Sequence, residues 1–189
     1  LVGPMPSGPG PIEIPLIREI ASYVPPGVST FLLTSEISAE GIIDIYFKTH
    51  TQVLQLVDAV ENNDVYKKLR GVLPHVKVVQ VIHVTGPESL EEALDVVPFV
   101  DGLLLDSGNP KLSIKELGGT GRVHDWSVSR AIIEKCTKPV LLAGGLNSRN
   151  VREAIDTVNP FGVDVCSGLR TNGQLDEDLL KNFVSEVRK

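Results

Sequence analysis

The sequence predicts an α/β fold of the TIM (β/α)8 barrel class in which one of the eight βα units is missing. Short β-branched runs alternate with amphipathic helical stretches along all 189 residues, as in repeated βα units on a parallel sheet. Seven such units can be counted. Glycine-containing turns at 144–145 and 167–168 follow the last two predicted strands, where barrels bind phosphate. An open dinucleotide-binding sheet instead places its glycine-rich turn after the first strand, so the barrel is favoured.

The predicted elements follow one another as strand and helix along the chain. Strands are expected where apolar and β-branched residues cluster, at 28–33, 53–57, 78–84, 100–105, 139–143 and 162–165, with a seventh, cut short, at 1–3. Helices are expected where apolar residues recur every three to four positions, at 15–23, 39–48, 63–72, 88–97, 127–135, 150–158 and 177–187. Short polar side chains that accept unpaired N–H groups mark four helix starts, at Ser38, at Asp125, at Asn147 or Ser148, and within 171–176.

Composition bounds the function. The chain is 42% hydrophobic and has no internal linker, so a single domain over residues 1–189 is expected. A net charge of −6 argues against nucleic acid or an anionic membrane as a general partner. The apolar runs are too short to span a bilayer. Small molecules or other copies of the chain are the expected partners, with a monomer or homodimer as the assembly.

Only two cysteines occur, Cys136 and Cys166, and they are far apart in the sequence. This spacing suggests neither a disulfide framework nor a zinc cluster. A reducing, cytoplasmic location and a site without a metal are therefore expected.

Two turns are candidate phosphate ligands. Gly144-Gly145 closes one predicted strand and Ser167-Gly168 closes the next. Glycine lets backbone N–H groups approach an anion, and a helix start adds partial positive charge. Either turn alone is as readily explained by glycine punctuating a loop. Together, on the last two strands, they favour a phosphate monoester.

Asp106 closes the apolar run Leu103-Leu104-Leu105 at the mouth of the predicted barrel. Barrel enzymes keep catalytic groups at this end of the strands. Burial there is expected to raise the pKa of the carboxyl group, as a general acid requires. The alternative is a helix cap or a loop ligand for Ser107, and spacing alone leaves both open.

The segment 117–126 contains three glycines and a threonine, which suit a mobile loop closing over a ligand. His124 lies beside the expected cap Asp125, where a single histidine is more often a packing or surface residue. It is left out of the mechanism.

In this order and spacing, the motifs at 103–107, 118–126, 143–147 and 162–168 resemble the C-terminal half of phosphoribosylanthranilate isomerases. Residues 53–58 are also similar to that family's Val-Gln-Leu-His-Gly strand end, and 28–34 to the strand before it, so the resemblance covers essentially the whole chain. It implies an Amadori rearrangement in tryptophan biosynthesis, converting N-(5'-phosphoribosyl)anthranilate to an aminodeoxyribulose phosphate without metal or organic cofactor.

The resemblance also implies roles for individual residues. Asp106 matches the general acid that opens the ribose ring. Asp164 matches a residue near the substrate's amino group and sugar. The phosphate-binding positions are Gly144, Gly145, Ser167 and Gly168, and the lid at 118–121 brings Gly119 and Thr120 to the substrate.

Three departures from the family pattern stand out. No segment of the chain matches the Lys-Ile-Cys-Gly motif that carries the family's general base. Most of the first βα unit is therefore expected to lie upstream of Leu1. Without it, little turnover is expected of the chain as printed. No arginine follows 1–3 to bind the anthranilate carboxylate, and Val57-Asp58 replaces His-Gly. A non-catalytic phosphate-binding homologue and an isomerase of another sugar phosphate are the alternatives.

Overall fold

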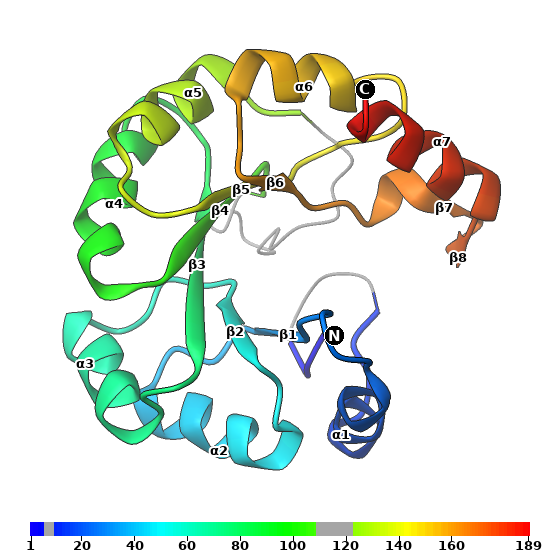
Figure 1. Cartoon of the computed structure of the whole chain (residues 1–189). Helices are drawn as coiled ribbons and strands as arrows, with labels where there is room; N and C mark the ends of the chain where they lie inside the picture. Colours follow the sequence, from blue (N-terminus) through cyan, green and yellow to red (C-terminus); the bar gives the residue numbers. More distant parts are fainter. Residues whose placement is uncertain (6–9, 109–122) are drawn as a thin grey trace.

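A computed structural model of the chain describes residues 1–5, 10–108 and 123–189. Its centre is a six-stranded, wholly parallel sheet in which each strand pairs with the next along the chain (Figure 1). The strands are β1 (Phe31–Thr34), β2 (Val53–Leu56), β3 (Lys77–His83), β4 (Gly102–Asp106), β5 (Val140–Leu142) and β6 (Gly162–Val163). A short antiparallel hairpin, β7 (Arg170–Thr171) with β8 (Gln174–Leu175), lies outside this sheet.

Helices form an arc around the sheet, with α1 and α7 at its two ends (Figure 1). They are α1 (Ile14–Tyr23), α2 (Ala39–Thr49), α3 (Asn63–Val72), α4 (Ser89–Val96), α5 (Trp126–Lys135), α6 (Val151–Val158) and α7 (Glu177–Val187). This arrangement confirms the predicted βα repeat and the barrel class. None of the helices in the described part of the chain has the length and apolar character needed to cross a membrane.

Most predicted helix starts are confirmed, and one is wrong. Ser38 accepts the N–H of Gly41, and Asp125 accepts that of Ser127. The start of α6 lies at Asn150 rather than at Asn147 or Ser148. The reason is that Asn147 belongs to the preceding turn, where its side chain accepts the N–H of Arg149 at 2.9 Å.

The N-terminal segment pairs with β1 through a single parallel bridge. Val2 bridges Leu33, with Gly3 N–H donating to the Leu33 carbonyl and Leu33 N–H donating to the Leu1 carbonyl, both at 2.9 Å. In the described residues no ladder joins this segment or β1 to β6. The described sheet is therefore curled and open between its first and last strands.

Alternate strand residues face two different cores. Ile82, Leu103 and Leu105 belong to the large core between sheet and helices. The opposite face of the sheet carries a smaller inner core, whose buried members are Val53, Val57, Val79, Val81, Leu104 and Ala143. Because side chains alternate along a strand, the residues that continue this inner face at the carboxyl ends of the strands line the mouth of the fold. These positions hold the candidate site.

Candidate active site

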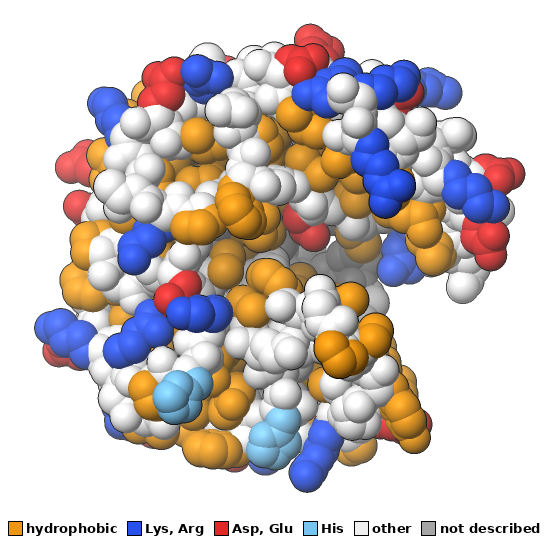
Figure 2. Space-filling view, viewed as in Figure 1, with side chains coloured by type: hydrophobic (Ala, Val, Ile, Leu, Met, Phe, Trp, Pro, Cys, Tyr) orange, Lys and Arg blue, Asp and Glu red, His pale blue; other side chains and the backbone are white. Residues whose placement is uncertain are grey.

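Three positions at the carboxyl end of the sheet carry polar side chains on its inner face. Strand register pairs His83 of β3 with Asp106 of β4. Ala143 and Asp164 continue the ladder one residue beyond β5 and β6, since the Ala143 N–H donates to the Leu105 carbonyl at 2.7 Å and the Asp164 N–H to the Leu142 carbonyl at 2.8 Å. Figure 2 shows a central hollow with hydrophobic side chains around it and acidic atoms inside.

Asp106 is buried, with 8% of its surface exposed. Burial raises the pKa of its carboxyl group, while the N–H of Ser107, which donates to Oδ1 at 2.7 Å, and the nearby His83 act in the opposite sense. The net direction is upward, as predicted from the sequence. A carboxyl group whose pKa is raised keeps its proton to a higher pH, which suits it to donating a proton.

Asp164 lies on the other side of the mouth, one residue after β6. Its side chain reaches solvent, yet the surrounding concave wall desolvates the carboxyl group. This desolvation, and then the negative charge of Asp106, raise the pKa of Asp164. The mouth therefore holds two carboxyl groups that disfavour each other's ionisation.

The turn after β5 is shaped by glycine and by two amide side chains. Gly144 and Gly145 adopt φ values of +87° and +64°. A side chain at 144 would lie 2.9 Å from the Ser107 nitrogen and 3.0 Å from Nδ1 of His124, so the position is open only to glycine. The Gly145 carbonyl accepts hydrogen bonds from the side-chain amides of Asn147 and Asn150, at 3.2 and 3.1 Å. These bonds fix the orientation of the turn.

The turn after β6 packs directly on the turn after β5. Ser167 and Gly168 begin a short 3-10 helix, Ser167–Leu169. A Cβ at 168 would lie 3.0 Å from the carbonyl carbon of Leu146, 3.1 Å from Cβ of Asn147 and closer still to the Leu146 carbonyl oxygen. The absence of a side chain at Gly168 therefore allows the two turns to meet.

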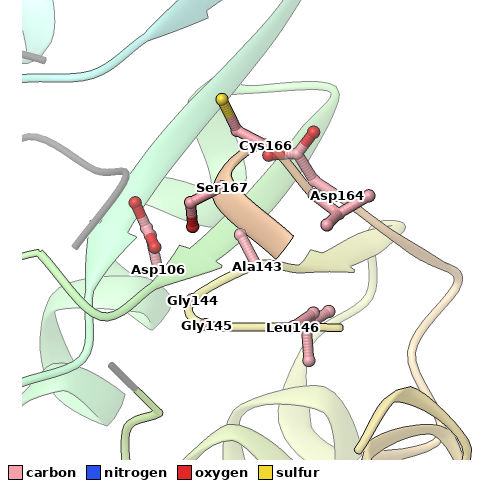
Figure 3. A pocket seen from close by; sticks show the side chains of 9 residues that line it. Asp106, Ala143, Gly144, Gly145, Leu146, Asp164, Cys166 and Ser167 are labelled. Atoms are coloured by element: carbon pink, nitrogen blue, oxygen red, sulfur yellow. The ribbon is translucent and has the colours of Figure 1, made fainter. Parts of the chain in front are cut away.

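The two turns and both carboxyl groups line one small pocket (Figure 3). Its wall contains Asp106, Gly144, Gly145, Asp164 and Ser167. Gly168 shapes this wall from behind. Five of the residues predicted from the sequence thus come together in space. Gly119 and Thr120, the predicted lid contacts, lie outside the described residues.

His124 packs behind the pocket. Its Nε2 lies 2.6 Å from the hydroxyl oxygen of Ser129, and burial lowers its pKa to about 4. The ring is therefore neutral near pH 7 and supports Gly144 from behind, in agreement with a packing role.

The two cysteines differ in position. Cys136 caps the end of α5, and its thiol donates to the Lys138 carbonyl at 3.5 Å. Cys166 is exposed and lines the pocket beside Ser167.

His83 is the mouth residue that sequence reasoning missed. It is buried, with 7% exposed, and its Nε2 lies 2.9 Å from the Val57 carbonyl oxygen. The signal was present in the sequence, because His83 continues the alternation of Val79 and Val81 by one further inward step.

Comparison with known proteins agrees with this geometry. Residues 22–186 match the family described as N-(5'-phosphoribosyl)anthranilate (PRA) isomerase. The chain is 37% identical over 178 residues to N-(5'-phosphoribosyl)anthranilate isomerase 2 of Methanosarcina mazei. The matched region covers 94% of this chain and 77% of the relative.

Solved structures agree as well. Phosphoribosyl anthranilate isomerase of Thermotoga maritima superposes with a TM-score of 0.77 at 30% identity, over 94% of this chain and 82% of the other. A structure of the same enzyme type in complex with reduced 1-(o-carboxyphenylamino)-1-deoxyribulose 5-phosphate gives a TM-score of 0.73 at 28% identity, over 94% and 80%. The chain belongs to the N-(5'-phosphoribosyl)anthranilate isomerase family.

Proposed function

We propose that the mouth of this fold isomerises N-(5'-phosphoribosyl)anthranilate, with the phosphate held between the turns after β5 and β6 and Asp106 as the general acid. Family membership makes the chain an aldose–ketose isomerase of tryptophan biosynthesis. The observation that carries the residue assignments is the shared pocket: a buried carboxyl group with a raised pKa stands in the wall that both glycine turns complete. Cytoplasmic location is part of the same proposal.

The phosphate end of the site depends on backbone N–H groups. No acceptor for the N–H groups of Gly144 and Gly145 is found among the described residues, and both glycines line the pocket. The asparagine amides hold the Gly145 carbonyl in place, which keeps the peptide dipoles of the turn fixed. Ser167 adds a hydroxyl group from the second turn. Fixed N–H and hydroxyl donors are the groups that bind a phosphate without a metal.

The sugar end of the site requires a proton donor for the ribose ring oxygen. Asp106 fits because desolvation raises the pKa of its carboxyl group while the Ser107 N–H fixes its orientation. Asp164 lines the same pocket, and the family resemblance assigns it to the sugar and the amino group. The sequence has no Lys-Ile-Cys-Gly motif, so no general base is assigned to the residues of this chain. The lid formed by 118–121, with Gly119 and Thr120, stays a prediction.

The missing motif favours a second candidate, a phosphate-binding homologue without turnover. Calorimetry and a fluorescence assay separate the two. The reduced product analogue should bind in either case, whereas turnover of freshly generated phosphoribosylanthranilate, measured with the natural coding sequence upstream of Leu1 included, is expected only of an enzyme.

The phosphate assignment is tested with Gly145→Asp. This substitution places a carboxylate against the phosphate and should abolish binding of the reduced analogue in calorimetry. Gly173→Asp is the matched control, because Gly173 also has a positive φ, +79°, but its surroundings are open. Unchanged affinity in Gly145→Asp would refute the phosphate site.

The acid assignment is tested with Asp106→Asn. The amide keeps the shape of the side chain and removes the transferable proton. In an enzyme restored with the upstream βα unit that carries the general base, the turnover number should fall by about 10²–10⁴-fold, with much less change in substrate affinity. Loss of affinity at constant turnover number would instead make Asp106 a binding residue.

A further inference from the structure

The wall of the proposed phosphate pocket carries two carboxyl groups and no cationic side chain. Asp106 ends β4 and Asp164 follows β6, and both line the same pocket as the turns after β5 and β6 (Figure 3). Among the described residues that form this wall there is no lysine, arginine or histidine. A phosphate held there therefore adds negative charge beside two groups that can themselves become negative.

The pocket is small enough to bring these charges together. Its cavity volume is about 40 Å³, room for roughly three water molecules or for the three free oxygens of a phosphate monoester. An anion that fills this volume lies against the whole wall, so Asp106 and Asp164 are both among its nearest neighbours. At such short range, in a site partly removed from water, like charges repel strongly and salt screens them little.

The groups proposed to hold the phosphate are neutral donors. The N–H groups of Gly144 and Gly145 and the hydroxyl group of Ser167 supply hydrogen bonds, but they do not neutralise a carboxylate. Protonation of a carboxyl group removes its repulsion of the phosphate and leaves these donors in place. Phosphate binding is therefore most favourable when the carboxyl pair holds a proton.

The surroundings of the two carboxyl groups preserve this coupling. The other charged or titratable groups that the described residues place around the pair are His83 beside Asp106, the Leu1 amine near Asp164, Cys166 in the wall and His124 behind Gly144. Burial is the largest influence on both carboxyl groups and raises the pKa of each, and an added negative charge acts in the same direction. The His124 ring, whose pKa burial lowers to about 4, is neutral near neutral pH and does not offset that charge.

Resting on the function proposed above, we propose that the pocket binds its phosphate together with a proton from solvent, which the pair formed by Asp106 and Asp164 takes up. The proton belongs to the pair, because the two carboxyl groups repel each other as well as the anion. The substrate's own phosphate then keeps the acid loaded for opening the ribose ring. The phosphate group thus contributes to the chemistry as well as to binding.

Sulfate is the probe for this coupling, because a phosphate monoester itself loses its second proton at about pH 6, whereas sulfate stays fully ionised. Titration calorimetry uses the protein with its natural coding sequence upstream of Leu1 included. Runs in two buffers of different ionisation enthalpy give the number of protons taken up per sulfate bound. The variants are Asp106→Asn, Asp164→Asn and the double variant. Asp95→Asn is the matched control, because Asp95 is exposed on α4 and lies outside the pocket wall.

Wild type and Asp95→Asn should take up protons on binding sulfate. Their sulfate affinity should fall as the pH rises, by up to about tenfold per pH unit for each proton taken up. Each single variant should take up fewer protons, and the double variant should take up none and lose this pH dependence. Circular dichroism checks folding, and the single variants carry the test if the double variant is unfolded.

Two results would overturn the inference while leaving the phosphate site intact. One is sulfate binding to wild type without proton uptake. The other is uptake that survives undiminished when the carboxyl groups are replaced, which would assign the proton to another group. A different result tests the proposed function itself. If neither sulfate nor the reduced product analogue binds wild type, or if both bind Gly145→Asp equally well, the phosphate site is wrong and the inference fails with it.

Discussion

Replacing Gly168 with alanine tests whether the two turns form a single phosphate site. The added Cβ would lie 3.0 Å from the Leu146 carbonyl carbon and 3.1 Å from Cβ of Asn147. Carbon atoms in contact prefer separations of about 3.5–4.0 Å, and the Leu146 carbonyl oxygen lies closer still, so one turn must move by at least about 0.5–1 Å. A shift of that size misplaces at least one donor to the phosphate. The loss of one hydrogen bond to a charged group, about 1.5–3 kcal/mol, weakens binding by roughly 10- to 150-fold.

Calorimetry with the reduced product analogue measures this loss, and thermal denaturation measures the cost of overpacking, about 1–3 kcal/mol. Gly71→Ala in α3 is the control, because nothing lies within 4 Å of the Cβ it would add. If Gly168→Ala is folded and binds the analogue as tightly as wild type, the two turns do not share a phosphate.

Two further predictions concern pH. Asp106 raises the pKa of Asp164, and repulsion between two charges is mutual. Removing the charge of Asp164 with Asp164→Asn should therefore lower the pKa of Asp106, and in an enzyme restored with its upstream unit the basic limb of the turnover profile should move to lower pH. An unmoved limb would place the two carboxyl groups too far apart to interact. His124 has a folded-state pKa of about 4 against 6.5 unfolded, so its contribution is complete above pH 6.5 and is lost as the pH falls towards 4. Urea denaturation of wild type and His124→Gln should show this difference, at most about 3 kcal/mol, and parallel pH dependences would contradict it.

Much of the fold was predictable because the signals are local. The period of apolar residues placed α3 and α7 at their observed bounds, 63–72 and 177–187. The start of β1, predicted at residue 28 and observed at Phe31, was not predictable, because a side chain from another part of the chain determines it. The Thr30 N–H donates to Oε1 of Gln52 at 2.7 Å instead of entering the strand ladder, and the strand begins at Phe31. A similar reason explains why α6 starts at Asn150 and not at Asn147. The side chain of Asn147 is already hydrogen-bonded within the turn after β5.

The site was predictable where a motif carried it and less so elsewhere. Asp106 and the glycine turns stand in recognisable strings of residues, and the structure brings them into one pocket. His83 belongs to no motif. Its position beside Asp106 appears only when the register sets β3 beside β4 and the carbonyl of Val57 is found within reach of Nε2. Which residues lie side by side on neighbouring strands depends on the register of the folded sheet, and neither composition nor motif spacing predicts that register.

Asp106 shows why two readings of one residue need not compete. From the sequence it was either a general acid or a ligand for the loop at Ser107, and in the structure its carboxylate accepts the Ser107 N–H. That hydrogen bond stabilises the ionised form and works against burial. Because burial is the larger effect, the pKa of the carboxyl group stays above its usual value and the group keeps its proton to a higher pH, while the hydrogen bond fixes the orientation of the carboxyl group. The local contact thus orients the acid, and the inner face of the sheet adjusts its strength.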